Sequence, residues 1–142
     1  MAKIESSAAS TPHRTAEYWR VRAGWTLSGL FILFMLGASI TPKFLMPEIA
    51  EQASTPIGVS PAHVPLIGAI ELIGTLLYAW RRTALLGAIT MTAVLGGAIA
   101  THMNAGSPLM SHTLFGVWLG LVMWGGLWLR DASVRAVLPR SR

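Results

Sequence analysis

One acidic residue, Glu71, stands inside an otherwise uncharged and mostly apolar run of residues 64–80. A carboxylate within a membrane helix costs roughly 2.5–3.5 kcal/mol on insertion scales, so it should face protein or a water-filled cavity and not lipid. Such a group can bind a ligand, accept or relay a proton, or hold helices together. Glu71 is therefore the first candidate for a functional site.

Two further ionisable residues are expected close to the level of Glu71. Glu71 lies about 10 Å below the outer end of its span, at roughly 1.5 Å per residue. The next apolar run ends just before His102, and Lys43 follows the first run. A lysine side chain is long enough to reach inward, whereas a contact between Glu71 and His102 would need helix tilt or a bridging water. We therefore predict one pocket that gathers these three side chains.

Helical spacing adds secondary candidates. Positions three, four and seven apart share a helix face, and from Glu71 these positions include Thr75 and Tyr78. Thr101 belongs to a similar stripe of small and polar residues in the next span, and His112 is expected near the same outer level. These four residues complete the candidate polar site, for which we assign no catalytic role.

Each ionisable candidate also has a purely structural interpretation. Glu71 could be protonated and hydrogen-bonded to a hydroxyl or backbone group, which would lock helices together. His102 and His112 could be polar helix ends at the membrane surface, and Lys43 an ordinary loop cation. Imidazole and carboxylate groups also bind zinc. No closely spaced histidine pair supports such a site, so we predict no metal.

The composition indicates a membrane protein. Of 142 residues, 53% are hydrophobic and only 12% are charged, and the mean hydropathy is +0.55. A soluble domain normally carries about 25% charged residues. Cysteine is absent, which excludes disulfides, iron–sulfur clusters and thiol redox chemistry. A redox role would therefore require a bound cofactor, for example a quinone.

The apolar runs predict an all-α, polytopic membrane protein with four transmembrane helices packed as a bundle. Each run is close to the roughly 20 residues that cross a bilayer core. The first run is too long for the apolar core of a secretory signal and lacks a good cleavage site, so we expect it to be retained. The expected spans are 23–40, 64–80, 83–101 and 113–129, within a membrane domain of residues 22–138. Residues 1–21 are expected to form a flexible basic tail, and residues 139–142 a C-terminal tail.

The charge distribution predicts the topology. The net charge of +5 could suggest nucleic-acid binding, but ten of the eleven Lys and Arg residues fall on one side of the expected spans, with only Lys43 on the other. Cytoplasmic loops carry this excess, so both termini should be cytoplasmic in a bacterial-type inner membrane. We therefore expect the lipid bilayer as a partner and exclude nucleic acid.

Four stretches resemble the DoxX-like family of small four-helix bacterial membrane proteins. The resemblance covers about residues 20–138, and it implies a four-helix membrane fold with Lys43, Glu71 and His102 at the family's characteristic polar positions. The family takes its name from a subunit linked to thiosulfate:quinone oxidoreductase, and some relatives associate with redox enzymes. The matching stretches are 42–44 (PKF), 67–74 (IGAIELIG), 95–102 (LGGAIATH) and 127–131 (LWLRD).

The leading functional hypothesis is a membrane subunit, or a protein that binds a small lipophilic molecule such as a quinone, within a redox system. Glu71 would accept or relay a proton, His102 would hydrogen-bond a ligand carbonyl or pass the proton outward, and Lys43 would tune the charge. Two alternatives are a proton-coupled small-molecule transporter and a structural or assembly partner without chemistry. The sequence leaves open whether the protein is an enzyme, whether it joins a redox enzyme complex and whether it forms an oligomer.

Overall fold

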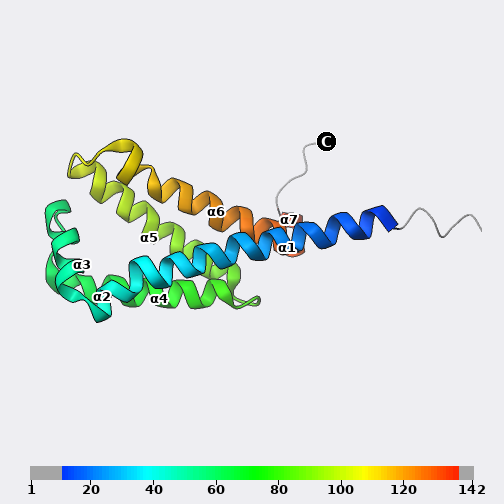
Figure 1. The fold of residues 1–142 in the computed structure, drawn as a ribbon, viewed down its shortest axis with the longest axis horizontal. Coiled ribbons are helices and arrows are strands. Elements are labelled where there is room, and N and C mark those ends of the chain that lie inside the picture. The colour runs from blue at the N-terminus through cyan, green and yellow to red at the C-terminus, as the bar shows by residue number, and fades with distance from the viewer. Residues whose placement is uncertain (1–10, 138–142) are drawn as a thin grey trace, which may run out of the picture.

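The computed structural model describes residues 11–137, and every regular element in that range is a helix (Figure 1). Short π-helical and 3-10 segments join or extend the α-helices. The α-helices are α1 (Thr11–Phe34), α2 (Thr41–Leu45), α3 (Pro47–Ser54), α4 (Val64–Ala79), α5 (Ala84–Asn104), α6 (Phe115–Arg130) and α7 (Ala132–Val137). The π-helices are η1 (Met35–Ile40) and η4 (Leu109–Thr113), and the 3-10 helices are η2 (Thr55–Ile57) and η3 (Pro61–His63).

Four continuous helical stretches are long and apolar enough to cross a membrane. A helix satisfies its own backbone hydrogen bonds, which is why apolar segments in lipid adopt this structure. The four stretches are Arg14–Leu45, Pro61–Ala79, Ala84–Asn104 and Leu109–Arg130. The prediction of an all-α chain with four such helices is confirmed.

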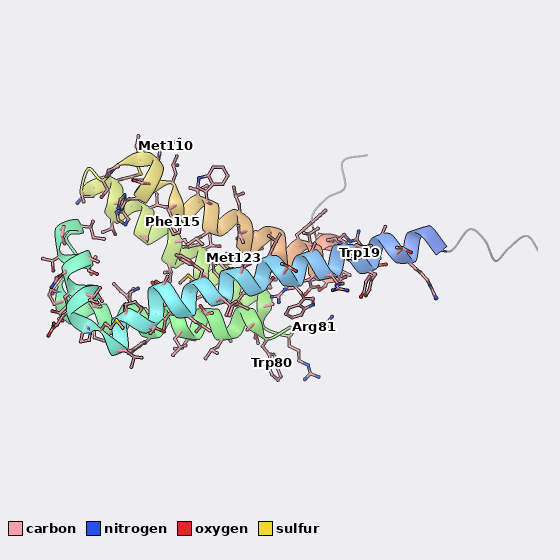
Figure 2. All side chains as sticks on the ribbon, in the orientation of Figure 1. Trp19, Trp80, Arg81, Met110, Phe115 and Met123 are labelled. Atoms are coloured by element: carbon pink, nitrogen blue, oxygen red, sulfur yellow. The ribbon has the colours of Figure 1, made fainter. Side chains whose placement is uncertain are left out.

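The long helices lie side by side (Figure 1). Helix α1 packs along α6, α4 packs along α5, and α5 also packs along α6, while η1 and α2 contact α4. The turn between α4 and α5 lies at one end, which we call the basic end, and α2, α3 and η4 lie at the opposite end, which we call the loop end. Figure 2 shows Trp80 and Arg81 at the basic end and Met110 at the loop end.

Glycines bring the helices into close contact. A Cβ atom placed on Gly87 of α5 would lie 2.1 Å from the backbone nitrogen of Tyr78 in α4. A Cβ atom on Gly126 of α6 would lie 2.7 Å from Oγ of Ser28 in α1. Small residues permit such close approach where lipid removes the hydrophobic drive between helices. The space between the helices is filled by a core that includes Phe31, Met35, Tyr78, Ala88, Met91, Met123 and Leu127.

Residues 11–21, which the sequence analysis assigned to a flexible tail, are helical, because α1 begins at Thr11. Polar side chains in this stretch pair on the helix surface. Arg20 Nη2 lies 3.2 Å from Glu17 Oε1, and Arg135 Nη2 lies 3.8 Å from the same oxygen. Ion pairs between residues three apart support a helix, and this stretch lies before the continuous apolar run that begins at Ala23. The remaining predicted tail residues, 1–10 and 139–142, lie outside the described residues.

The first membrane helix also continues beyond its expected end at Ile40. Pro42 has no N–H to donate, so an α-helical hydrogen bond is lost at this point. The chain widens into the π-helix η1, in which both the backbone N–H and the hydroxyl of Thr41 donate to the Leu36 carbonyl, the hydroxyl at 2.6 Å. The helix then resumes as α2. The proline thus changes the winding of the helix without ending it.

Candidate functional site

A buried ion pair joins η1, α2 and α4 at the loop end. Lys43 Nζ lies 2.9 Å from Oε2 of Glu71. The Glu71 residue as a whole is only 6% exposed. The Ser39 hydroxyl donates to the same carboxylate oxygen at 3.0 Å. Lys43 also donates to the carbonyl and to the hydroxyl oxygen of Ser39, at 3.0 and 2.9 Å. A buried ion pair needs such additional hydrogen bonds to offset its desolvation.

Two local features bring Lys43 to Glu71. The continuous helix places Ser39 and Lys43 four residues apart, so they share a face. On α4, Gly68 lies one turn before Glu71 and leaves room for the lysine stem. A Cβ atom on Gly68 would lie 3.1 Å from Cβ of Lys43 and 3.1 Å from the Phe44 ring.

Both hydrogen bonds to the carboxylate of Glu71 end on one oxygen, Oε2. The other oxygen, Oε1, has no hydrogen-bond partner within residues 11–137, and it is not among their fully buried unpaired atoms. A carboxylate oxygen can accept hydrogen bonds from a ligand. The charge of Glu71 is thus compensated while one of its oxygens stays available.

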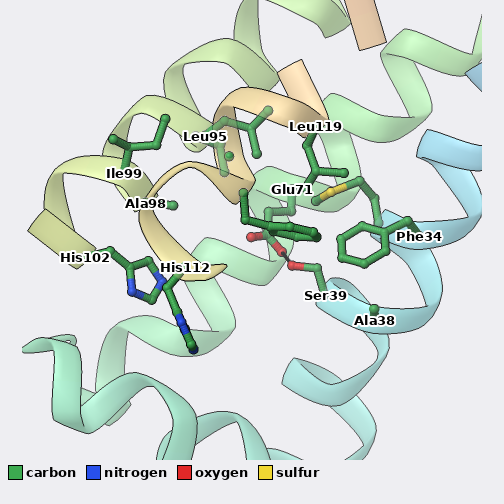
Figure 3. A pocket seen from close by; sticks show the side chains of 14 residues that line it. Phe34, Ala38, Ser39, Glu71, Leu95, Ala98, Ile99, His102, His112 and Leu119 are labelled. Carbon is green, nitrogen blue, oxygen red and sulfur yellow. Dashed lines mark hydrogen bonds between the residues drawn. The ribbon is translucent and has the colours of Figure 1, made fainter. Parts of the chain in front are cut away.

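Glu71 lines a cavity of about 190 Å³ between η1, α5 and α6 (Figure 3). The walls are mostly apolar, with Glu71 and Ser39 at one side and two histidines at another. The lining residues are Phe34, Met35, Ala38, Ser39, Glu71, Val94, Leu95, Ala98, Ile99, His102, His112, Phe115, Gly116 and Leu119.

A second, larger cavity of about 430 Å³ also has Glu71 in its wall and lies beside α4 and α5. The two cavities share Ser39, Glu71, Val94 and Ala98, so both border the Glu71 side chain. The remaining residues of the larger cavity are Lys43, Ser54, Ile57, Val59, Ile67, Ile70, Ala93, Gly97 and Thr101.

The two histidines of the smaller cavity lie close together. The rings of His102 and His112 have their centroids 5.6 Å apart, and Figure 3 shows them across the cavity from Phe34. Nδ1 of His102 is 3.1 Å from the Ser107 hydroxyl, which leaves Nε2 for a ligand. No hydrogen bond joins Glu71 to His102 within the described residues. The structure places both side chains around one cavity without direct contact.

The secondary candidates separate into two groups. His112 lines the smaller cavity and Thr101 the larger one, where the Thr101 hydroxyl donates to the Gly97 carbonyl at 2.8 Å. Thr75 and Tyr78 line neither cavity. The Thr75 hydroxyl is buried 3.9 Å from the sulfur of Met91. Sharing a helix face with Glu71 therefore does not bring these two side chains into the same site.

Tyr78 belongs to a separate network towards the basic end. Its hydroxyl donates to the Met123 carbonyl at 2.7 Å and lies 2.8 Å from Oγ of Ser28, which therefore acts as the donor. Arg130 donates to the Tyr78 carbonyl at 2.7 Å. The guanidinium lies 4.3 Å from the centroid of the Trp25 ring and 4.6 Å from that of Tyr78. These contacts join α1, α4 and α6.

Replacing Tyr78 by phenylalanine is expected to lower the free energy of unfolding by about 1–3 kcal/mol, because Met123 and Ser28 lose a buried partner while the ring packing stays. Thermal unfolding of the purified protein in mild detergent measures the change. Tyr18→Phe is the matched control, since Tyr18 is 55% exposed and should tolerate the change. Equal midpoints for the two variants would contradict a structural role of the Tyr78 hydroxyl.

Two polar partners were not predicted from the sequence. Ser39 forms hydrogen bonds with both Lys43 and Glu71. Its spacing of four residues from Lys43 could have predicted the first contact. That signal depends on a helix running through Pro42, which was expected to lie in a loop. The sequence analysis used Arg130 for the topology and for the family resemblance but did not predict its burial, and the structure shows it 6% exposed. Its burial depends on Trp25 and Tyr78 from two other helices.

The described residues hold no group of three His, Asp or Glu side chains that could bind a metal ion. No curated protein and no solved structure matches this chain. One family model does match, that of the DoxX-like family, over residues 26–126. This range contains Ser39, Lys43, Glu71 and His102. With its four apolar helices and this match, the chain is a multi-pass membrane protein that belongs to the DoxX-like family.

Proposed function

We propose that this protein binds one small lipophilic molecule of the quinone type beside Glu71, as a membrane subunit of a redox system. The observation that carries the proposal is a charge-compensated carboxylate, Glu71, that lines two mostly apolar cavities and keeps one oxygen free. Ligand pockets are typically apolar cavities with a few well-placed polar groups. The polar groups here come from Glu71 and His102.

The two polar groups suit both oxidation states of such a ring. A quinol has hydroxyl groups, and Oε1 of Glu71 can accept a hydrogen bond from one of them. A quinone has only carbonyl oxygens, and Nε2 of His102 can donate to one of these when it carries the proton. Lys43 already directs hydrogen bonds to two oxygens of Ser39 and to Glu71. Its role in the proposal is to neutralise the carboxylate.

The same pairing favours ligand binding over proton-coupled transport. A proton carrier has to take up and release a proton during each cycle. The carboxylate of Glu71 is instead held in place by the Lys43 ammonium 2.9 Å away and by the Ser39 hydroxyl at 3.0 Å. We therefore assign Glu71 to ligand binding and charge balance and not to proton transport.

The proposal includes a bacterial inner membrane, a four-helix bundle, and a topology with both termini in the cytoplasm. Its support is the distribution of the Lys and Arg residues, ten of which belong to the two termini and the turn between α4 and α5. The positive-inside rule assigns that side to the cytoplasm. The Glu71 site then lies in the outer half of the membrane.

Titration of the purified protein with a quinol in nanodiscs tests the proposed function. Glu71→Gln should weaken binding by about 10- to 100-fold, because a hydrogen bond to a charged acceptor contributes about 1.5–3 kcal/mol. Glu48→Gln, the same change on an exposed residue of α3, should leave binding unchanged.

A second variant separates ligand contact from folding. His102→Ala keeps the Lys43–Glu71 pair and should weaken binding of the quinone form more than that of the quinol. Thermal unfolding confirms that each variant is folded. Absence of binding by the unmodified chain, or equal binding by the unmodified chain and Glu71→Gln, would refute the proposal.

A further inference from the structure

We infer that the ligand is an amphiphile with a polar ring and one hydrocarbon chain, and that the chain leaves the protein sideways through the larger cavity into lipid. This inference rests on the proposed function and adds the shape of the ligand and its route. The ring would occupy the smaller cavity, beside Glu71 and His102. The chain would pass Glu71 and run along α4 and α5.

The sizes of the two cavities support this division. An apolar cavity of about 150 Å³ holds a benzene ring, so the smaller cavity of about 190 Å³ has room for a ring. It is smaller than the roughly 300–1,000 Å³ of typical ligand pockets. The larger cavity, of about 430 Å³, falls within that range. A ligand that uses both cavities has to pass beside Glu71, which lines both.

The chemistry of the walls differs along the larger cavity. Ser39 and Glu71 line both cavities and Lys43 lines the larger one, whereas Ile67 and Ile70 provide apolar surface along α4. On α5, the wall beyond the shared residues consists of small side chains and Thr101, whose hydroxyl is bonded to the backbone. Along these walls of α4 and α5 a hydrocarbon chain would find apolar contacts and no unpaired hydroxyl.

Part of the wall of the larger cavity is exposed on the surface of the molecule. Ile70 is 40% exposed, and Ala93 and Gly97 are exposed as well. All three belong to helices long and apolar enough to cross a membrane. A Cβ atom placed on Gly97 would have no atom within 4 Å. The proposed exit of the hydrocarbon chain is this exposed stretch, which would face the lipid tails.

Two neighbouring glycines of α5 provide a matched pair for the test. Gly97 lines the larger cavity, whereas Gly96 lines neither cavity. Both are exposed, and a Cβ atom on either would meet nothing within 4 Å. Gly97→Leu should therefore fill the proposed exit, and Gly96→Leu should add the same side chain elsewhere. Ala93→Leu provides a second variant that fills the cavity.

The probes are a substituted benzoquinone without a side chain and the same ring with a decyl chain, titrated in nanodiscs of one composition. The readout is the advantage of the decyl chain, defined as the ratio of the affinities for the decyl form and the bare ring, and it should be the same in the unmodified protein and in Gly96→Leu. Gly97→Leu and Ala93→Leu should bind the bare ring as the unmodified protein does and lower that ratio by about tenfold or more, because a leucine in the path of the hydrocarbon chain overpacks it, which typically costs about 1–3 kcal/mol. Partition into the lipid is the same for every variant and cancels in the comparison.

The failures of the two proposals can be distinguished. Suppose that the bare ring binds and that Glu71→Gln weakens this binding, but that Gly97→Leu keeps the full advantage of the decyl chain. Only the proposed route of the hydrocarbon chain is then refuted. An equal loss in Gly96→Leu and Gly97→Leu also refutes the route. If the unmodified chain binds neither probe, the proposed function itself fails.

Discussion

Lys43→Met is expected to lower the free energy of unfolding by about 3–5 kcal/mol, the usual cost of removing one partner of a buried ion pair. The side chain of Glu71 is only 7% exposed and that of Lys43 16% exposed, so the carboxylate left behind would be poorly solvated. Ser39 would also lose the donor that binds its carbonyl and hydroxyl oxygens. Unfolding in mixed detergent micelles, followed by circular dichroism, measures the loss.

The double variant Lys43→Met/Glu71→Leu should recover much of that stability. Replacing both members of a buried pair by apolar groups is often neutral, because no unpaired charge remains. Arg82→Met is the control for loss of a cation, since Arg82 is exposed at the basic end. Such surface changes usually stay within about 0.5 kcal/mol. If the double variant were as unstable as Lys43→Met, the single loss would not come from an uncompensated charge.

The recovered double variant would have a functional consequence. It keeps the helices in place but lacks both the carboxylate and its counter-charge. We therefore expect it to fold and to lose quinol binding. A folded double variant that still bound quinol would show that the ion pair serves stability alone.

Gly87→Ala is expected to destabilise the protein by about 3 kcal/mol, at the upper end of the usual range for an overpacked core. The added Cβ atom would lie 2.1 Å from the nitrogen and 2.5 Å from Cα of Tyr78. These are backbone atoms, so no side-chain rotation relieves the clash and α4 must move away from α5. That movement would also strain the hydrogen bond from Arg130 to the Tyr78 carbonyl.

Gly96→Ala is the matched control for Gly87→Ala on the same helix. Nothing lies within 4 Å of a Cβ atom at Gly96, and alanine stabilises a helix interior by about 0.5–1 kcal/mol relative to glycine. The two variants should therefore change the unfolding midpoint in opposite directions. Equal midpoints would mean that α4 and α5 do not approach each other so closely at Gly87.

Properties that depend on neighbouring residues along the chain were predicted well. The four apolar runs became four helices, because a long apolar segment satisfies its backbone most simply as a helix. Glu71 was recognised as buried and polar for the same local reason. The ends of the first helix were predicted less well. Surface ion pairs accompany its N-terminal extension, and a π-helix allows the helix to continue past Pro42. Hydropathy predicts neither feature.

The apolar content of each segment was enough to predict a membrane protein with a buried carboxylate on α4, because insertion into lipid depends on local hydropathy. The residues that contact this carboxylate depend instead on how distant segments pack. Thr75 and Tyr78 share its helix face, but the Thr75 hydroxyl lies beside the Met91 sulfur and the Tyr78 hydroxyl binds Met123 and Ser28. Ser39 and Lys43 reach it instead, because η1 and α2 cross α4 at the level of Gly68. Helix crossings depend on packing between distant segments, and helical periodicity contains no information about them.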